Sequence, residues 1–181
     1  TRLGLSSRDG ETFDDSTSRP IMLEAAVTGE NDATIVALHR VFVANNKHLD
    51  NISSDIRRVV LVNEVLNFGD TSLFDYLMAE YMKARDANYR ADISAAVARS
   101  RDLTAIAQVL RTLKNGAVIK PQDLRSWYGD LIANEAAEQA TWDWLRENWQ
   151  WLSETVGGEA KMNRYIRLTA QTFKTRKRLI E

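Results

Sequence analysis

Apolar residues recur every three or four positions along nearly the whole chain, and this helical period is the feature that most constrains the fold. Two prolines and eight glycines interrupt the 181 residues, and they fall between the apolar-periodic stretches, where the breakers of a helical protein belong. No stretch alternates apolar and polar residues as a half-buried strand does. The sequence therefore predicts an all-α chain without a sheet.

Breakers and capping residues divide the chain into about nine helices. Pro20 is placed in the first turn of the first helix, after a polar leader that runs to Arg19, and this helix ends at Gly29. The others are expected at about 31–45, from a cap at Ser53 or Ser54 to Gly69, from Thr71 through Met82, at about 87–100, from a cap at Asp102 to Gly116, and from Lys120-Pro121 onward. An eighth helix is expected at about 138–155, ended by Gly157-Gly158, and a ninth carries Met162 through Phe173.

Short consecutive helices joined by tight turns pack as antiparallel neighbours. A row of such pairs forms an α-α superhelix of the HEAT-like solenoid type. No crisp repeat is visible in the sequence, so this architecture rests on the rhythm of the helices. Residues 1–181 are accordingly expected to form a single all-helical domain.

Charge and composition exclude several classes of protein. The 24 basic and 25 acidic residues give a net charge of -1, which offers no electrostatic reason to expect a nucleic-acid partner. Cysteine is absent, which excludes disulfides and cysteine-ligated metals and fits a reducing cytosol. No apolar run approaches the ~18 residues that span a bilayer, and the first residues lack the apolar core of a signal peptide. We expect a soluble cytoplasmic chain without a membrane partner, and its start at Thr1 rather than Met suggests a segment of a longer polypeptide.

The most informative local feature is the tryptophan-rich stretch at 138–155. On a helical wheel one face carries Trp142, Leu145, Trp149 and Leu152. Trp144 and Trp151 lie nearly opposite, which gives an apolar arc of roughly 180°. The remaining wedge is filled by Asp143, Arg146, Glu147 and Gln150. We therefore expect one continuous helix that is packed by several neighbours, with its tryptophans in the core rather than exposed as a stacking platform for bases or sugars.

Little in the sequence is suited to chemistry of its own. His39 and His48 are separated by a predicted turn, and we interpret them as surface or capping histidines, because a catalytic zinc site needs several converging ligands. The motifs H-E-x-x-H, G-x-S-x-G, G-x-G-x-x-G and the P-loop are absent. No catalytic, cofactor-binding or metal-binding residue is therefore assigned. A basic run of Lys174, Arg176, Lys177 and Arg178 is interpreted as a solvated helix end, with an acidic partner or a peptide carboxylate as the alternative.

Several stretches carry a specific family signature. In the second half they read K-P-Q-D-L-R-S-W at 120–127, A-T-W-D-W-L-R-E-N-W at 140–149 and T-V-G-G at 155–158. In the first half, residues 54–60 and 74–93 fit the pattern D-x-R … fD-x-L-x-x-x-Y … r-x-D-i, and Leu3-Gly4 resembles an entry point. Together they resemble the last third of the aminopeptidase N family, most closely the cytosolic enzymes of lactic acid bacteria. The resemblance covers essentially the whole chain.

The resemblance implies a zinc metallopeptidase of the gluzincin type. Such an enzyme has a β-rich N-terminal domain, a thermolysin-like domain that holds zinc, and a C-terminal helical superhelix that closes the substrate chamber. None of the zinc ligands, the G-A-M-E-N motif or the catalytic tyrosine maps onto this chain, so no catalytic residue carries over. The family commonly has Asn-Pro and a later Gly where this sequence has Asn134-Glu135-Ala136-Ala137. The chain is expected to be an incomplete part of the superhelix.

These observations lead to one functional prediction and one alternative. The prediction is a non-catalytic part of the C-terminal helical domain of a zinc aminopeptidase that removes N-terminal amino acids from peptides. It would enclose the substrate chamber, and its partners would be the N-terminal and catalytic domains of the same polypeptide and peptide substrates. The alternative is a free-standing α-solenoid scaffold that binds a protein or peptide in its groove.

Overall fold

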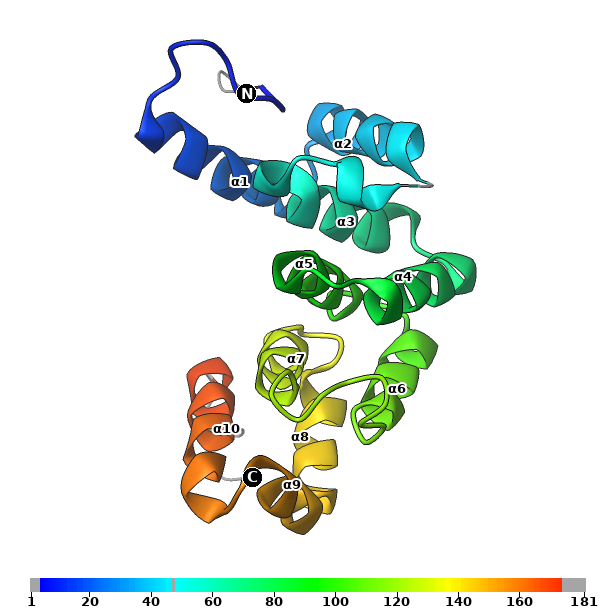
Figure 1. The fold of residues 1–181 in the computed structure, drawn as a ribbon, viewed down its shortest axis with the longest axis vertical. Helices are drawn as coiled ribbons and strands as arrows, with labels where there is room; N and C mark the ends of the chain where they lie inside the picture. Colours follow the sequence, from blue (N-terminus) through cyan, green and yellow to red (C-terminus); the bar gives the residue numbers. More distant parts are fainter. Residues whose placement is uncertain (1–3, 47, 174–181) are drawn as a thin grey trace. The chain divides into compact units, whose positions relative to one another are not determined.

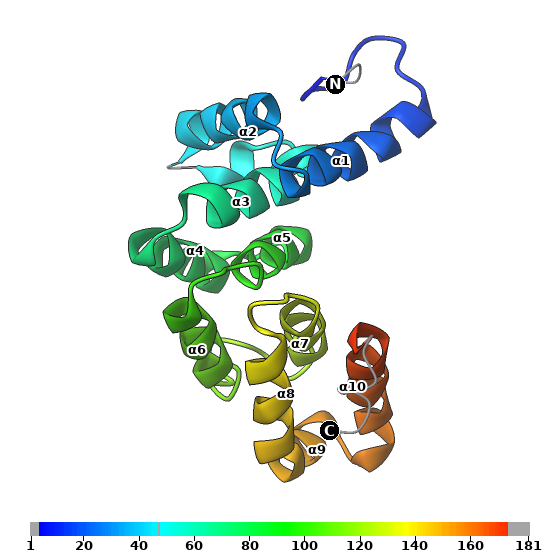
Figure 2. The ribbon, with the colours of Figure 1, turned by 180° about the vertical axis from the view of Figure 1, so that it is seen from behind.

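The computed structural model describes residues 4–46 and 48–173, and every regular element within them is helical (Figure 1), as the reverse view in Figure 2 also shows. The predicted all-α class is confirmed. The described residues hold ten α-helices and one short 3-10 helix, where the sequence predicts about nine helices. The chain divides into two compact units, Thr1–Val97 and Ala98–Glu181.

The first unit contains five α-helices, with the 3-10 helix η1 (Leu49–Asn51) after the second: α1 (Phe13–Thr28), α2 (Asp32–Asn45), α3 (Ser54–Phe68), α4 (Thr71–Lys83) and α5 (Ala87–Val97). Side-chain oxygens cap the N-termini of α2, α3 and α4. Asn31 accepts from the Thr34 N–H at 3.0 Å, Asp70 accepts from the Leu73 N–H at 2.8 Å, and Ser53 caps α3. Each cap satisfies an N–H that has no partner inside its helix. The predicted starts of α2, α3 and α4 are therefore confirmed.

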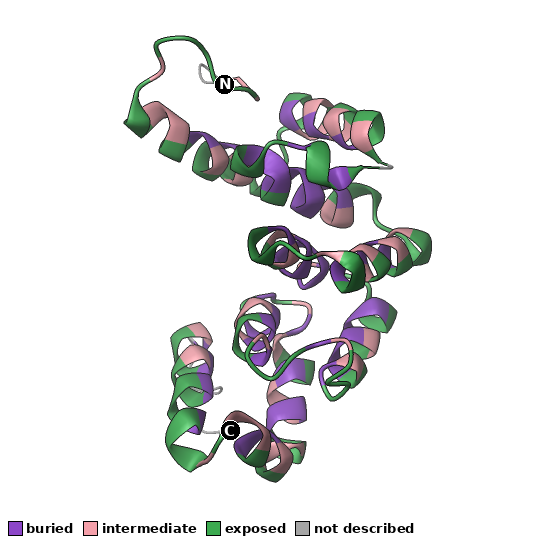
Figure 3. Ribbon diagram, in the orientation of Figure 1, coloured by how far each residue is buried: buried purple, intermediate pink, exposed green. Residues whose placement is uncertain are grey.

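Helix α3 is the centre of the first unit. It packs against α1, α2 and α5, and it is buried along most of its length (Figure 3). The apolar core that it shares with these neighbours includes Leu23, Leu38, Val60, Leu61 and Ile93. A helix covered in this way must also satisfy its buried polar side chains within the unit. This requirement governs the contacts of Arg57, Asn63 and Glu64, all of which are buried.

Helix α1 begins at Phe13, and Pro20 lies inside it, so the predicted start at Pro20 is wrong. A proline inside a helix costs about 3 kcal/mol, because it removes one hydrogen bond and its ring crowds the preceding turn. The sequence before Pro20 has no apolar period, and Phe13 is 80% exposed, so the earlier turns give no hydrophobic signal.

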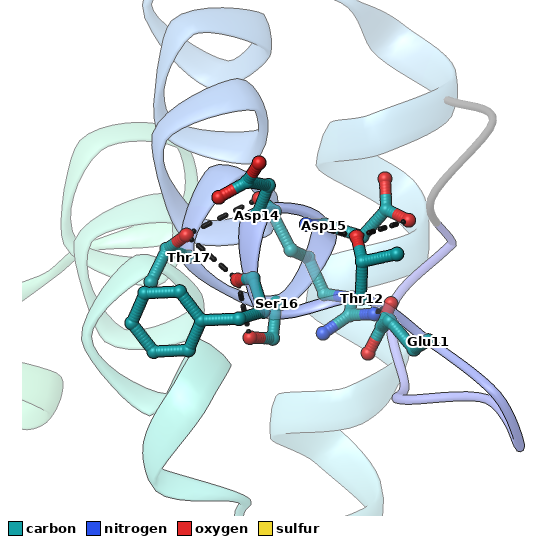
Figure 4. Close-up of polar contacts among 8 residues, drawn as sticks. Glu11, Thr12, Asp14, Asp15, Ser16 and Thr17 are labelled. Atoms are coloured by element: carbon teal, nitrogen blue, oxygen red, sulfur yellow. Dashed lines mark hydrogen bonds and ion pairs between the residues drawn. The ribbon is translucent and has the colours of Figure 1, made fainter.

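Polar contacts hold the turns of α1 that precede the proline (Figure 4). The Thr12 hydroxyl accepts from the Asp15 N–H at 3.1 Å and donates to the Asp15 carboxylate at 2.9 Å. In the same helix the buried Arg19 pairs with Glu11, which stands in the segment before α1. The cap stabilises a helix that the proline by itself disfavours, and the Arg19–Glu11 pair joins this helix to the segment before it.

The second unit contains the other five helices: α6 (Leu103–Thr112), α7 (Leu124–Ile132), α8 (Glu138–Glu147), α9 (Trp149–Val156) and α10 (Glu159–Thr172). Asp102 caps α6 as predicted, since its carboxylate accepts from the Thr104 N–H at 2.8 Å. Helix α7 packs against α8 and α10, and α10 also packs against α9. The fully covered side chains of this unit include Leu113, Ile119, Trp127, Tyr128, Leu131, Leu145 and Leu152.

The tryptophan-rich stretch is two helices rather than the one predicted, because the chain leaves helical geometry at Asn148, where φ is -113° and ψ is 18°. The Asn148 amide donates to the Trp144 carbonyl at 2.8 Å, and Lys114 donates to the Asn148 side-chain oxygen at 2.8 Å. An asparagine side chain competes with the backbone for hydrogen bonds in this way. The contact from Lys114 lies 34 positions away in sequence, so no local pattern reveals it.

Three other predicted boundaries shift. Helix α6 ends at Thr112 rather than at Gly116, and α7 begins at Leu124, after a turn closed by the Asp123 N–H and the Lys120 carbonyl at 2.9 Å. Helix α5 ends at Val97 rather than near Ser100. The Asn134 amide explains the last shift, because it donates to the carbonyls of Ala98 and Ser100 at 2.8 and 2.7 Å and so holds these residues out of a helix.

Candidate functional site

The two histidines lie in different settings and do not meet. His39 of α2 places Nδ1 at 2.9 Å from Oε2 of Glu64 in α3, and its ring stacks on Phe68 with centroids 4.0 Å apart. His48 is exposed just before η1 and makes no capping hydrogen bond there. Among residues 4–46 and 48–173, no group of three histidine, cysteine, aspartate or glutamate side chains is arranged to hold a metal. His39 is therefore a link between α2 and α3, a role that sequence reasoning missed.

The Glu64 side chain, which forms this contact with His39, is buried and only 6% exposed. Burial raises the pKa of Glu64 above 4.5, and the hydrogen bond and charge of His39 oppose the rise. The neighbouring Asn63 amide donates to the Ile35 carbonyl at 3.1 Å. Both contacts join α3 to α2, so they position helices rather than a reacting group.

A second polar network joins α3, α4 and α5. Arg57 Nε donates to Asp92 Oδ2 at 2.8 Å, and the guanidinium lies 4.9 Å from the centre of the Tyr89 ring. The Tyr89 hydroxyl in turn donates to Glu80 Oε2 at 3.2 Å. Burial raises the pKa of Tyr89, and the Glu80 carboxylate raises it further, so this phenol stays protonated. Arg57 and Asp92 stand in the two stretches of the first half that carry the family signature.

The tryptophans divide between the core and half-covered positions. Trp127 and Trp144 are buried, whereas Trp142, Trp149 and Trp151 are partly exposed. Trp144 and Trp151 meet edge to face with centroids 6.0 Å apart. The predicted core role is thus confirmed for the buried rings and only partly for the others. Arg146, Glu147 and Gln150 form the predicted exposed strip, and Asp143 is half-buried beside it.

A pocket of about 510 Å³ lies within the second unit, and we call it the cationic pocket. The start of α7 and the turn before it, the end of α9, and the first half of α10 contribute its walls. Its lining is Pro121, Gln122, Arg125, Ser126, Thr155, Val156, Lys161, Arg164 and Tyr165. Three of these side chains are basic and none is acidic. Sequence reasoning missed this group, although Lys161, Arg164 and Tyr165 share one helical face by their spacing.

The basic run Lys174, Arg176, Lys177 and Arg178 lies outside the described residues. Within the described ranges, no helix combines the length and the apolar character that crossing a bilayer requires.

Comparison with known proteins shows a consistent similarity. Residues 1–181 match the family model described as the ERAP1-like C-terminal domain. Aminopeptidase N of Lactobacillus helveticus is 43% identical over 180 residues, which are 99% of this chain and 21% of that protein. Aminopeptidase N of Lactobacillus delbrueckii subsp. lactis is 37% identical over 180 residues, with the same two shares. Aminopeptidase M1-C of Oryza sativa subsp. japonica is 24% identical over 184 residues, again 99% and 21%. The chain spans about one fifth of the length of these relatives.

Proposed function

The chain belongs to the ERAP1-like C-terminal domain family, and from this membership we propose that it is a non-catalytic part of the C-terminal helical domain of a zinc-dependent aminopeptidase that removes N-terminal amino acids from peptides. The observation that carries the proposal is the asymmetry of the match. The similarity takes in 99% of this chain but only 21% of aminopeptidase N from Lactobacillus helveticus. The greater part of such a protein therefore lies outside this sequence and is available to supply the chemistry.

Zinc, in this proposal, belongs to the catalytic domain of the parent protein, where it supplies an activated water for attack on a peptide carbonyl. The described side chains of this chain do not fit a zinc site. His39 contacts Glu64 and Phe68, and His48 is exposed to solvent after the end of α2. No step of hydrolysis is assigned to these residues.

The contribution of the chain is enclosure of the substrate. Side-chain hydrogen bonds between helices, such as Arg57 to Asp92 and Tyr128 to Thr169, restrict the motion of neighbouring helices. Such helices form a rigid wall. A stiff helical wall beside an active site limits the length of an entering peptide, excludes folded proteins and contacts the part of the substrate remote from the reacting bond. The partners in this proposal are the N-terminal and catalytic domains of the same polypeptide and the peptide substrate. The proposed location is the cytoplasm, in keeping with the resemblance to cytosolic enzymes.

The test is complementation of a truncated parent enzyme. The portion of the parent protein that precedes this sequence is expressed without it, and the 181-residue chain is added as a separate polypeptide. Turnover is compared on a single aminoacyl dye and on a decapeptide. We expect the added chain to raise decapeptide turnover much more than dye turnover, because only contacts remote from the reacting bond are restored. The chain alone is expected to hydrolyse neither substrate.

Three outcomes contradict the proposal. Hydrolysis by the 181-residue chain alone, or tight stoichiometric zinc binding by it, would overturn the non-catalytic assignment. Failure of the two polypeptides to associate in sedimentation would instead favour a free-standing scaffold. A heat-unfolded sample of the chain serves as the control for non-specific effects of added protein.

A further inference from the structure

The cationic pocket combines elements that are far apart in sequence. Arg125 stands in the first turn of α7, whereas Lys161 and Arg164 stand on α10, about one turn apart. Both helices belong to the second compact unit, in which α7 and α10 pack directly against each other. The pocket volume of about 510 Å³ falls in the range of small-ligand pockets.

The charge of the lining is unbalanced. Its nine residues include three cations and no carboxylate. Within the described part of the chain, Arg125, Lys161 and Arg164 form no ion pair with a protein carboxylate. The acidic residues closest to the lining in sequence are Asp123, Glu154 and Glu159, and none of them lines the pocket. Like charges placed together in this way repel each other unless an anion joins them.

Neutral donors accompany the cations. Tyr165 is only 3% exposed yet lines the pocket, and among the described residues no group hydrogen-bonds to its hydroxyl. Burial raises the pKa of Tyr165 to about 12 while the charges of Arg125 and Arg164 oppose the rise. The phenol therefore keeps its proton, and both guanidinium groups lie near enough to act on it. Helix α7 also begins at this wall without a side-chain cap, and a helix N-terminus carries partial positive charge.

We infer that the cationic pocket binds a small oxyanion that carries two or more negative charges. Guanidinium groups from two helices suit such a ligand, because planar N–H pairs match the oxygens of a phosphate or a carboxylate. Lys161 adds a third charge, and the Tyr165 hydroxyl adds a neutral donor. The inference rests on residues of the second unit alone and requires neither zinc nor the remainder of the parent protein.

The experiment is isothermal titration calorimetry of the 181-residue chain with two probes. Inorganic pyrophosphate represents phosphate chemistry, and citrate represents carboxylate chemistry. We expect saturable binding of one or both probes with one site per chain. The affinity should fall as salt rises from about 20 to about 200 mM, because salt screens the attraction between exposed charges. Binding of both probes identifies a general oxyanion site, and binding of one identifies the preferred chemistry.

Matched variants distinguish the pocket from the general charge of the surface. The double variant Arg125→Gln with Arg164→Gln is expected to weaken binding at least about tenfold, since it removes two charge-assisted contacts. Tyr165→Phe keeps the ring and should weaken binding by a smaller factor. Arg167→Gln removes an exposed charge from the same helix α10 outside the pocket, and binding should be unchanged.

The proposal fails if neither probe binds at millimolar concentration. It also fails if Arg167→Gln weakens binding as much as the double variant does. All three variants are checked by circular dichroism melting. Because Arg125, Arg164 and Arg167 are exposed, their substitution should leave the melting temperature within a few degrees of the unmodified chain.

Discussion

Arg57 of α3 and Asp92 of α5 form an ion pair in which Nε lies 2.8 Å from Oδ2, and both side chains are largely buried. Burial raises the pKa of Asp92 despite the opposing charge and hydrogen bond of Arg57. The contact therefore offsets only part of the cost of removing the carboxylate from water. It nonetheless joins two helices that are separated by α4 in sequence.

Removing one partner of this pair should destabilise the first unit strongly. Arg57→Ala leaves Asp92 buried without its closest counter-charge, and we expect a loss of about 3–5 kcal/mol in the free energy of unfolding. The measurement is urea unfolding followed by circular dichroism. Lys83→Ala is the control, because Lys83 pairs with Glu80 on the surface at 3.0 Å and is 72% exposed. That change should cost less than about 1 kcal/mol, and equal losses in the two variants would contradict the buried role of Arg57.

Trp127 and Trp149 should respond differently to truncation. Trp127 is fully buried, so Trp127→Ala leaves a cavity and should cost about 3–5 kcal/mol. Trp149 is half-covered, so Trp149→Ala should cost about 1–2 kcal/mol, because less apolar area is lost. From the sequence alone, Trp149 belongs to the predicted core face, where its truncation is expected to cost about 3–5 kcal/mol. Urea unfolding of both variants decides the order, and a larger loss for Trp149→Ala would mean that its ring is covered.

Asn134 should be a point at which a one-atom change is costly. Its buried amide donates to the carbonyls of Ala98 and Ser100, and its oxygen accepts from the Ala136 N–H at 3.1 Å. Asn134→Asp replaces the donor with an oxygen that faces two carbonyls, and we expect a loss of at least about 2 kcal/mol. Asn163→Asp on the exposed face of α10 is the matched control and should change stability by less than about 0.5 kcal/mol. Thermal unfolding of the two variants provides the comparison, and similar melting temperatures would rule out this role of Asn134.

The raised pKa of Glu64 predicts a dependence of stability on pH. Because the folded state holds the proton more tightly than the unfolded state, the contribution of Glu64 is fully present below its ordinary pKa of 4.5. It is lost as pH rises through the higher pKa of the folded protein. As pH rises through this window, the unmodified chain should therefore lose stability relative to the Glu64→Gln variant, as judged by their free energies of unfolding.

Two measurements check the Glu64 prediction. Carbon NMR of the Glu64 carboxyl should give a midpoint above 4.5, and urea unfolding at several pH values should give the trend in stability. Glu24→Gln is a control on the half-buried side of α1. A Glu64 midpoint below 4.5 would show that the His39 contact outweighs burial, and the predicted trend would then reverse.

Sequence by itself determined the elements whose signals are local. The caps at Ser53 and Asp102 were predictable because a side-chain oxygen acts on N–H groups within the same helical turn. The all-α class followed from apolar periodicity, which also acts over a few residues. The stretches at 120–127 and 140–158 indicated the family that the whole-chain comparison then showed.

Only the tertiary structure decided the features that depend on residues far apart in sequence. Pro20 lies within α1 although it disfavours a helix, and the tryptophan helix breaks where Lys114 reaches Asn148. The partner of Glu64 is 25 positions away, and the cationic pocket needs α7 packed on α10 before its charges meet. Burial and long-range pairing act on atoms that the fold brings together, so their energies cannot be assigned until the packing of the helices is known.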